Sequence, residues 1–360
     1  MNVCERGAAK QISQVVQVSR VRMNPYVRLL QGALLEAGVA CEVLEGLSPR
    51  LLQPFLGISD VLHVHWLELL YASGSFGRSL RLFAAVFLGL LRAKAGGCRL
   101  VYTLHNLTPH ERGFVIIDRL ARLLLVRMVD AIHVHGDRAA ADMAETFARH
   151  DRVYVIPHGS YIGAYPNQCE QGQARTRLGL PENAFVFLFL GQVRRYKGVE
   201  DLVTAFSRLG DETSWLLIGG NAHDAEYSDE LTQLTKDKER VLARLQYVPD
   251  AEVQYFLNAC DVCVMPYREA TTSGAAILAF SFGKPIVAPS LGGFPDLAGD
   301  GRGILYEPEE GGGLVEAMRR ARSEDMAAAG QKALAWAMEH EWRALAPAFV
   351  RMYTDVLQTG

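Results

Sequence analysis

Residues 266–289 (PYREATTSGAAILAFSFGKPIVAP) contain the first group of side chains suited to chemistry. The stretch predicts a strand ending near Pro266, a helix over residues 273–282 and a strand over residues 285–288. Four small residues stand at the start of that helix, namely Thr271, Thr272, Ser273 and Gly274. Free backbone N–H groups at the positive end of a helix dipole can bind a phosphate. The alternative is that a hydroxyl simply caps its own helix.

A cluster of basic residues forms the second candidate group. Arg194, Arg195 and Lys197 lie between a predicted strand over residues 184–191 and a predicted helix over residues 199–209. They form either a solvated basic turn or a site for charge-assisted hydrogen bonds to a diphosphate. The loop 192–198 and the start of the helix at residue 273 both follow strands that we predict to belong to one sheet. Two independent anion-binding signals in one sheet are stronger than either alone.

Histidines gather at the predicted ends of strands in the first half of the chain, namely His63, His65, His105, His133, His135 and, just beyond a strand, His158. Residues i and i+2 of a strand share a face, so each H-x-H pair could bind a metal ion. We favour the alternative, in which such histidines are hydrogen-bonded in a core. His105 is the best candidate for an acid or base, because Asn106, Thr108 and Pro109 favour a turn directly after it.

Strands and helices alternate along the chain. In the first half we predict strands over residues 14–19, 41–44, 59–66, 99–105, 131–135 and 153–157, with helices over 25–38, 69–91, 116–129 and 138–149. In the second half we predict further strands over residues 214–219, 245–248 and 261–265, with helices over 231–242 and 251–259. Strands that are apolar on both faces and alternate with helices indicate an α/β fold of two doubly wound, Rossmann-like parallel sheets facing across a cleft.

The domain boundaries follow from composition. Residues 1–165 form a first domain, and residues 166–183, rich in Gly, Gln and Pro, read as a linker. Residues 184–340 form the second domain. Residues 341–360 are helical and exceed what the second sheet needs, so they can pack back on the first domain.

Composition excludes several classes of protein. The net charge of −3 argues against a nucleic-acid binder. The first twenty residues lack the apolar core of a secretory signal, and the apolar run 82–91 is too short to cross a bilayer. Six scattered cysteines fit reduced thiols in a cytoplasm, and the pair Cys260 and Cys263 has no second pair to complete a zinc site. We therefore expect a cytoplasmic protein that holds no metal ion.

Residues 76–99 are a candidate membrane contact. This segment combines the apolar run with five basic residues and no acidic residue, the basic ones being Arg78, Arg81, Arg92, Lys94 and Arg99. Such a segment can lie on the anionic inner face of a membrane. The alternative is a buried helix with solvated ends.

The second half of the chain resembles the donor-binding half of a GT-B glycosyltransferase, and is most similar to the retaining family four, also called group 1. The resemblance lies in residues 189–206 (FLGQVRRYKGVEDLVTAF), 216–220 (LLIGG), 247–269 (YVPDAEVQYFLNACDVCVMPYRE) and 283–288 (GKPIVA). The first half is similar in outline, through NPYVRLL, HVHW, TLHN and VIPHG. The resemblance implies an N-terminal acceptor-binding domain and a C-terminal domain that binds a nucleotide sugar.

The resemblance also implies roles for single residues. Lys197 would stabilise the leaving diphosphate in place of a metal ion, with Arg194 or Arg195 assisting. Glu269 would lie near the donor sugar. Further donor contacts would come from Gly220, Tyr247, Val248, Thr271, Thr272, Ser273, Gly274 and Ala275. Acceptor contacts would come from His63, His65 and His158.

Three features depart from the family pattern. The usual arginine is Gln192 here, so either neighbouring arginine could substitute. The second of two family glutamates is absent, because Ile277, Leu278 and Ala279 occupy its region. Residues 20–26 (RVRMNPY) replace the N-terminal glycine-rich loop, and a neighbouring, inverting GT-B family is an alternative.

The leading hypothesis is transfer of a sugar from a UDP- or GDP-sugar to a hydroxyl of a glycan or a lipid-linked acceptor, as in polysaccharide or glycoconjugate biosynthesis. An inverting reaction would need a base, for which His105, or else His65 or His158, is placed. One alternative is a nucleotide-sugar-binding protein without transfer activity. Another is a GT-B epimerase, for which Glu269, Glu68 and Glu111 offer carboxylates. The sugar, the acceptor, the stereochemical outcome and the oligomeric state stay open.

Overall fold

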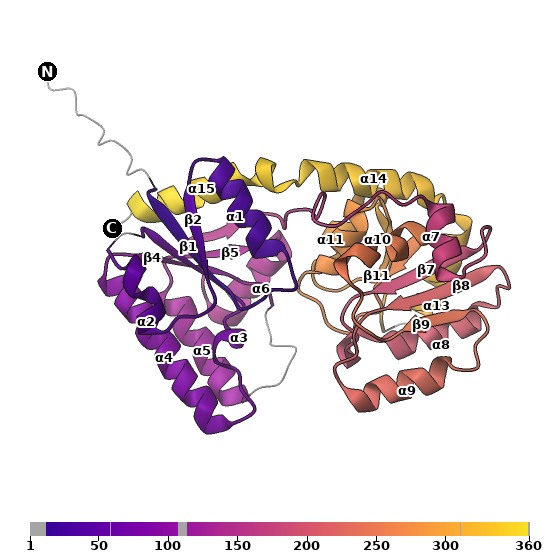
Figure 1. The fold of residues 1–360 in the computed structure, drawn as a ribbon, viewed down its shortest axis with the longest axis horizontal. Helices are drawn as coiled ribbons and strands as arrows, with labels where there is room; N and C mark the ends of the chain where they lie inside the picture. The colour runs from indigo at the N-terminus through magenta and orange to yellow at the C-terminus, as the bar shows by residue number, and fades with distance from the viewer. Residues whose placement is uncertain (1–11, 58, 107–113, 310, 359–360) are drawn as a thin grey trace, which may run out of the picture. The chain divides into compact units, whose positions relative to one another are not determined.

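The computed structural model describes residues 12–57, 59–106, 114–309 and 311–358. The chain divides into two compact units, of which unit 1 comprises Met1–Gly159 and Trp342–Gly360, and unit 2 comprises Ser160–Glu341. Each unit is built around one parallel sheet with helices on both faces (Figure 1). The predicted α/β fold with two doubly wound sheets is confirmed. No helix within the described ranges is long and apolar enough to cross a membrane.

The sheet of unit 1 has the strand order β2-β1-β3-β4-β5-β6, and every pair is parallel. Its strands are β1 (Gln14–Val18), β2 (Ala40–Leu44), β3 (Val61–His65), β4 (Arg99–Thr103), β5 (Ala131–Val134) and β6 (Val153–Val155). The chain order reverses direction beside β1, because β2 and β3 lie on opposite sides of it. Such a reversal is where a doubly wound sheet binds its ligands.

Two hydrophobic cores cover this sheet. Its helices are α1 (Tyr26–Glu36), α2 (Pro49–Leu52), η1 (Gln53–Phe55), α3 (Glu68–Tyr71), α4 (Phe76–Ala95), α5 (Val115–Met128), α6 (Asp137–Phe147) and α15 (Trp342–Gln358). Helices α2 to α6 pack on one face, and α1 packs with α15 on the other. The C-terminal helix, yellow in Figure 1, thus lies beside the indigo helix α1 of the same unit.

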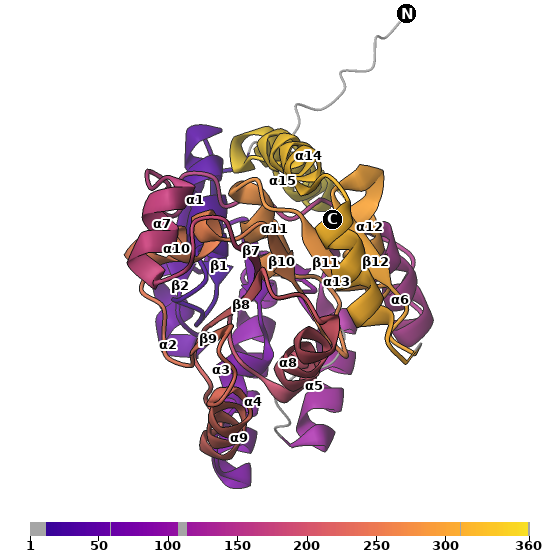
Figure 2. The same cartoon turned by 90° about the vertical axis from the view of Figure 1, so that its right-hand side faces the viewer.

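The sheet of unit 2 has the order β12-β11-β10-β7-β8-β9 and is also parallel. Its strands are β7 (Phe185–Leu190), β8 (Ser214–Gly219), β9 (Val241–Arg244), β10 (Val262–Val264), β11 (Ile286–Pro289) and β12 (Gly303–Tyr306). Its helices are α7 (Gln171–Leu178), η2 (Arg195–Lys197), α8 (Val199–Leu209), α9 (Ala225–Thr235), α10 (Asp250–Ala259), α11 (Gly274–Ser281), α12 (Phe294–Ala298), η3 (Gly299–Gly301), α13 (Gly313–Ser323) and α14 (Met326–Glu339). Figure 2 shows α13 beside α8, and α7 beside α10.

The predicted linker over residues 166–183 is wrong. Helix α7 occupies it, begins with a capping box between Glu170 and Gln173, and packs on α10. Arg175 is buried and forms an ion pair of 2.9 Å with Asp261. The polar residues that suggest a linker are therefore capping and packing contacts within unit 2, and the chain passes between the units at Gly159 and Ser160.

The prediction of a helix over residues 231–242 and a strand over residues 245–248 is also wrong. Helix α9 begins earlier, because the Asp224 side chain accepts from the Tyr227 N–H and caps it. It ends at Thr235, and residues 241–244 then pair with β8 as strand β9. Helical spacing of apolar residues ran on across this boundary and hid the strand.

Candidate functional site

Lys197 supplies an unneutralised cation at the carboxyl end of β7. Its Nζ lies 4.9 Å from the centroid of the Tyr267 ring and forms no ion pair with a described carboxylate. Burial lowers the pKa of Lys197 below its ordinary value. The charge is therefore poorly solvated, and an anionic ligand would improve its environment.

Two loops meet at this lysine. The Arg268 N–H donates to the Tyr196 carbonyl over 2.8 Å, which joins the loop after β7 to the loop after β10. Gly198 has a φ of 60°, and a Cβ there would lie 2.2 Å from the Pro266 carbonyl oxygen. Strands β7 and β10 are also where the chain order of this sheet reverses. Lys197 thus lies at the reversal point, where doubly wound sheets bind ligands.

The start of α11 follows the same loop. The Ser273 hydroxyl accepts from the Ala276 N–H over 3.3 Å, so Ser273 caps its own helix. The carbonyl of Thr271 accepts from the Gly293 N–H over 3.0 Å, and Thr272 is half-buried. The backbone N–H groups of Gly274 and Ala275 are therefore the ones that we predict to bind an anion, because N–H groups in the first turn of a helix have no partner inside that helix.

The two arginines differ. Arg195 forms hydrogen bonds of 2.9 and 2.8 Å with both carboxylate oxygens of Glu230 and stacks on the Tyr227 ring. A donor would have to draw the half-exposed guanidinium away from Glu230, so the role of Arg195 in donor binding stays a prediction. Arg194, half-buried at the start of η2, keeps the predicted role.

The remaining predicted donor residues lie at neighbouring strand ends. Glu269 is exposed after β10, and Val248 is half-buried after β9. Tyr247 is half-exposed and donates to Asp250 over 3.3 Å. Gly220 has a φ of 145°, and a Cβ there would lie 1.7 Å from the Gly191 carbonyl oxygen. Only glycine allows this approach of the loops after β7 and β8.

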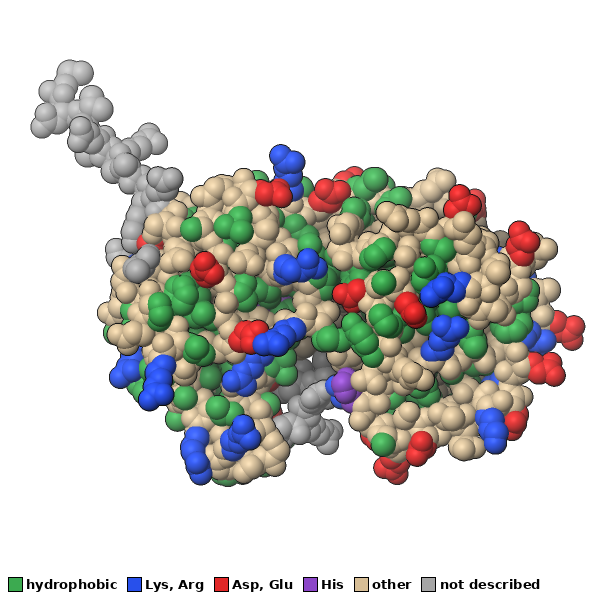
Figure 3. All heavy atoms as spheres, viewed as in Figure 1, with side chains coloured by type: hydrophobic (Ala, Val, Ile, Leu, Met, Phe, Trp, Pro, Cys, Tyr) green, Lys and Arg blue, Asp and Glu red, His purple; other side chains and the backbone are tan. Residues whose placement is uncertain are grey.

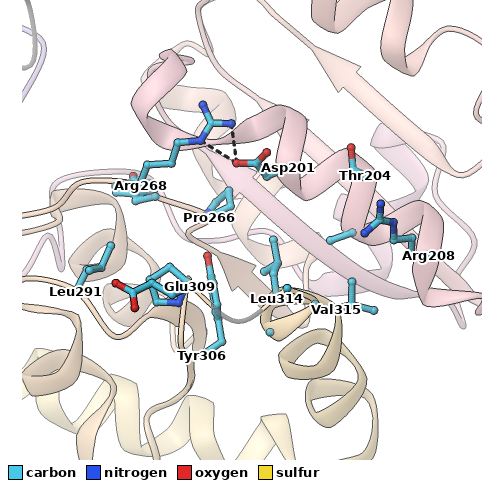
Figure 4. Close-up of a pocket in the computed structure, with 16 residues that line it drawn as sticks. Asp201, Thr204, Arg208, Pro266, Arg268, Leu291, Tyr306, Glu309, Leu314 and Val315 are labelled. Atoms are coloured by element: carbon cyan, nitrogen blue, oxygen red, sulfur yellow. Dashed lines mark hydrogen bonds and ion pairs between the residues drawn. The ribbon is translucent and has the colours of Figure 1, made fainter.

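A pocket of about 650 Å³ is lined by the Pro266–Arg268 loop and by residues of α8 and α13 (Figure 4). The Arg268 guanidinium at its rim pairs with Asp201 and Glu200, at 2.7 and 2.9 Å. Glu309 adds a carboxylate to the lining. Arg208 also lines the pocket, so its two carboxylates are matched by two guanidinium groups. None of the predicted donor residues lines this pocket, and the predicted donor site therefore stays at Lys197.

A directed chain of hydrogen bonds runs through the buried histidines of unit 1. His133 Nε2 lies 2.8 Å from the Ile156 carbonyl, which can only accept, so its Nδ1 accepts from Thr103 over 2.9 Å. Thr103 in turn accepts from His63 Nε2 over 2.7 Å, and His63 Nδ1 accepts from Tyr353 over 2.8 Å. Both nitrogens of His63 are occupied and the residue is fully buried. Its predicted acceptor-binding role is therefore wrong.

A second chain ends at His105. The Gln17 Oε1 accepts from His65 Nε2 over 2.9 Å, so His65 Nδ1 accepts from His105 Nε2 over 3.1 Å. His65 is fully buried with both nitrogens occupied, and its predicted role as acceptor contact or base is wrong. His105 keeps a lone pair on Nδ1, which has no described partner, and Trp66 stacks on its ring at 3.7 Å.

Burial keeps these histidines neutral. It lowers the pKa of His65 to about 3, and the pKa values of His133 and His158 to about 4. Burial and the neighbouring imidazoles hold the pKa values of His63, His105 and His135 well below 6.5. The lowered pKa leaves His105 uncharged and able to accept a proton at neutral pH, and it also makes the ring a weaker base than a free imidazole.

Several residues that contact the buried histidines of unit 1 were not predicted from the sequence. The Tyr26 ring contacts His65, His105, His135, His158 and Trp342 edge-on, at 4.8 to 5.6 Å. Both ring nitrogens of His135 are buried without a described partner. His158 Nδ1 donates to the Gly159 carbonyl over 2.7 Å. Gln17 had a signal, because it is a polar residue between the apolar Val16 and Val18 of β1. Tyr353 and Trp342 come from α15 and had none.

The described residues hold no group of three or more His, Cys, Asp or Glu arranged for a metal ion. The predictions for Thr108, Pro109 and Glu111 fall outside the described residues.

The family model for glycosyl transferases group 1 matches residues 184–324. A GDP-mannose:glycolipid 4-beta-D-mannosyltransferase from Xanthomonas campestris pv. campestris is 30% identical over 302 residues, covering 82% of this chain and 79% of that protein. This chain belongs to the group 1 glycosyltransferases. The predicted family and the prediction of an enzyme are confirmed, and the non-catalytic and epimerase alternatives are not supported.

Solved structures show the same fold as this glycosyltransferase. Sucrose-phosphate synthase from Thermosynechococcus elongatus superposes with a TM-score of 0.74 at 16% identity, covering 97% of this chain and all of that one. Anabaena HepE, in complex with UDP and glucose, gives 0.71 at 18% identity, covering 95% of this chain and all of that one. The fold is GT-B.

Proposed function

We propose that this glycosyltransferase moves a hexose from a nucleoside diphosphate sugar to a hydroxyl of a glycan or lipid-linked acceptor, without a metal ion. The observation that carries the proposal is the position of Lys197 over the Tyr267 ring, in a loop hydrogen-bonded to the loop that leads into α11, where the sheet of unit 2 reverses. A half-buried, poorly solvated cation in a loop joined to the start of a helix suits a diphosphate.

The chemistry needs negative charge stabilised on the leaving group. The bond from C1 of the sugar to the diphosphate breaks, and its electron pair leaves on the diphosphate oxygen. Lys197, Arg194 and the amides of Gly274 and Ala275 would hold that charge. The acceptor oxygen forms the new bond to C1 and gives its proton to a base.

We assign the base to His105. Its neutral ring has a lone pair on Nδ1, and burial keeps the ring uncharged. The Xanthomonas relative is named for a β-linked product. From an α-linked donor, a β-linked product requires inversion at C1 in one displacement, which is the reaction that needs such a base.

GDP-mannose is the first donor to test, because the Xanthomonas relative is named for it, and UDP-glucose is the second. The same relative is named for a glycolipid acceptor, so we propose a lipid-linked acceptor at the cytoplasmic face of a membrane.

A donor screen tests the proposal. Hydrolysis and transfer are measured with GDP-, UDP- and dTDP-sugars in the presence of a metal chelator, with titration calorimetry of the same donors. We expect turnover of one nucleotide series that the chelator does not lower. Binding without any turnover would show a protein that has lost transfer activity.

A further inference from the structure

The outward sides of α4 and α5 expose more apolar surface than the rest of unit 1 requires. On α4 the exposed side chains are Phe76, Leu80, Leu88 and Leu91, each 47–55% accessible. On α5 they are Val115, Ile116, Leu120 and Leu123, each 41–79% accessible. The spacing within each helix places its four side chains on one face, since a helix turns 100° per residue. We call this surface the α4–α5 face.

The two helices form one continuous surface. Both pack against the same face of the unit 1 sheet through a shared core, and they contact each other. The Phe76 and Phe114 rings meet edge-on at 5.1 Å where the two helices begin. Figure 1 shows α4 and α5 side by side.

The charges on this face are all positive. Arg78, Arg81 and Arg92 on α4, and Arg119 on α5, are exposed and form no ion pair with a described residue. Basic side chains gather at the lower left of Figure 3, where Figure 1 places α4. The sequence of α4 contains no acidic residue.

The acidic residue of α5 does not offset these charges. Asp118 is buried and accepts a hydrogen bond of 2.8 Å from the Tyr71 hydroxyl. Neither helix therefore presents an acidic side chain on its outward side. The face combines exposed hydrocarbon with unneutralised guanidinium groups.

We propose that the α4–α5 face binds the surface of a bilayer that contains anionic lipids. Its hydrocarbon side chains would enter the boundary between headgroups and acyl chains, while the arginines pair with lipid phosphates. The absence of negative charge matches an anionic surface. The surface extends the membrane contact predicted for residues 76–99 onto α5, and it is independent of the donor site.

The test is co-sedimentation of the full chain with vesicles, without donor or acceptor. One set of vesicles is phosphatidylcholine alone, and the other contains about a third phosphatidylglycerol. We expect binding to the anionic vesicles that weakens as salt rises, and little binding to the neutral ones.

Two variants separate the two halves of the face. The double substitution Arg81→Glu with Arg92→Glu should lower the partition coefficient on anionic vesicles by at least about tenfold, because it reverses two charges near the surface. Ile116→Ser with Leu120→Ser should lower the partition coefficient by a similar factor, and binding should still weaken as salt rises.

The matched control is Arg28→Glu with Arg351→Glu. These arginines are exposed on α1 and α15, which cover the opposite face of the same sheet. The partition coefficient of the control should lie within about twofold of the wild-type value, because charges farther from the membrane than a Debye length are screened by salt. Equal loss in the control, or no binding of the wild type to anionic vesicles, would overturn the proposal. Concentration-dependent self-association abolished by Ile116→Ser with Leu120→Ser would instead identify an interface between copies.

Discussion

The hydrogen bonds around His105 determine which of its nitrogens can accept a proton. Gln17 can only accept through Oε1, so the proton of His65 is on Nε2 and that of His105 is on Nε2 as well. The amide of Gln17 is held on its other side by a contact of 3.6 Å from its Nε2 to the Cys41 sulfur. A buried glutamine on β1 thus sets the tautomer of the proposed base.

Substitution of Gln17 tests this arrangement. Gln17→Leu should lower kcat by about tenfold with little change in donor KM, because His105 would spend time in the wrong tautomer. Gln17→Glu keeps an acceptor and should retain more activity than Gln17→Leu. Two-bond ¹H–¹⁵N correlations of labelled histidine should show a proton on Nε2 of His105 in the wild type.

Gln14→Leu is the matched control for that experiment. Gln14 lies on the same strand, and its Oε1 accepts from Ser59 over 3.1 Å, outside the histidine chain. Its substitution should leave the His105 tautomer unchanged. A wild-type His105 protonated on Nδ1, or a tautomer insensitive to Gln17→Leu, would contradict the account.

Residues whose signal is local in the sequence indicated the loops of the candidate donor site, and their roles in binding stay predictions. Lys197 and Ser273 stand out from their own loop and helix start, and the structure brings their loops together. The partners of His63 and Arg195 could not be foreseen, because they are distant in sequence. Tyr353, 290 residues away, occupies His63, and Glu230, 35 residues away, occupies Arg195.

At the scale of elements, one close backbone contact positions η2 against the loop after β10. Gly198 adopts a left-handed φ of 60° and packs on the Pro266 carbonyl. A side chain there cannot be accommodated without moving one of the two loops. The position of Lys197 therefore depends on this glycine.

Gly198→Ala should weaken nucleoside diphosphate binding at least about tenfold and lower stability by more than the roughly 1–2 kcal/mol cost of a left-handed residue. The control is Gly210→Ala, because Gly210 has a φ of 70° with open space around it. The control should lose about 1 kcal/mol of stability and keep its nucleotide affinity. Titration calorimetry measures the nucleotide affinity, and urea unfolding measures the stability. Equal nucleotide affinity in the two variants would show that Gly198 does not position Lys197.

The sequence predicted the β-α alternation because buried parallel strands and amphipathic helices leave strong local patterns. The prediction was wrong at α9 and β9, because the apolar residues of the half-buried strand 241–244 continue the helical spacing of the residues before them. The prediction of a linker in place of α7 was wrong for another reason, because the polar residues of α7 make tertiary contacts that composition cannot reveal.

At the scale of the whole molecule, unit 1 should be sensitive to acid. The unfolded histidines titrate near 6.5, whereas burial holds the pKa values of His133 and His158 at about 4. Below about pH 6.5 the unfolded state therefore binds more protons than the folded state, and stability falls. Each of these two histidines should lower the free energy of unfolding by about 2 kcal/mol when the pH falls from about 6.5 to about 4.5.

Hydrogen exchange measured by mass spectrometry checks this prediction. Protection of β3, β4 and β5 should fall between about pH 6.5 and pH 4.5, after correction for the intrinsic exchange rate. Between about pH 7.5 and pH 8.5 it should be constant, because both states are then neutral at these residues. Peptides from β7 and β8 serve as an internal control, and constant protection of β4 at low pH would contradict the prediction.

The proposed mechanism depends on Lys197, which would stabilise the leaving diphosphate in place of a metal ion. The measurement that tests it most directly is kcat for transfer by Lys197→Ala and by the exposed control Lys236→Ala, each with a metal chelator present. If Lys197 has this role, Lys197→Ala should lower kcat by about 10²–10³, the control should be unchanged, and the chelator should not affect the wild type. Unchanged turnover in Lys197→Ala, or loss of wild-type activity on chelation, would contradict it.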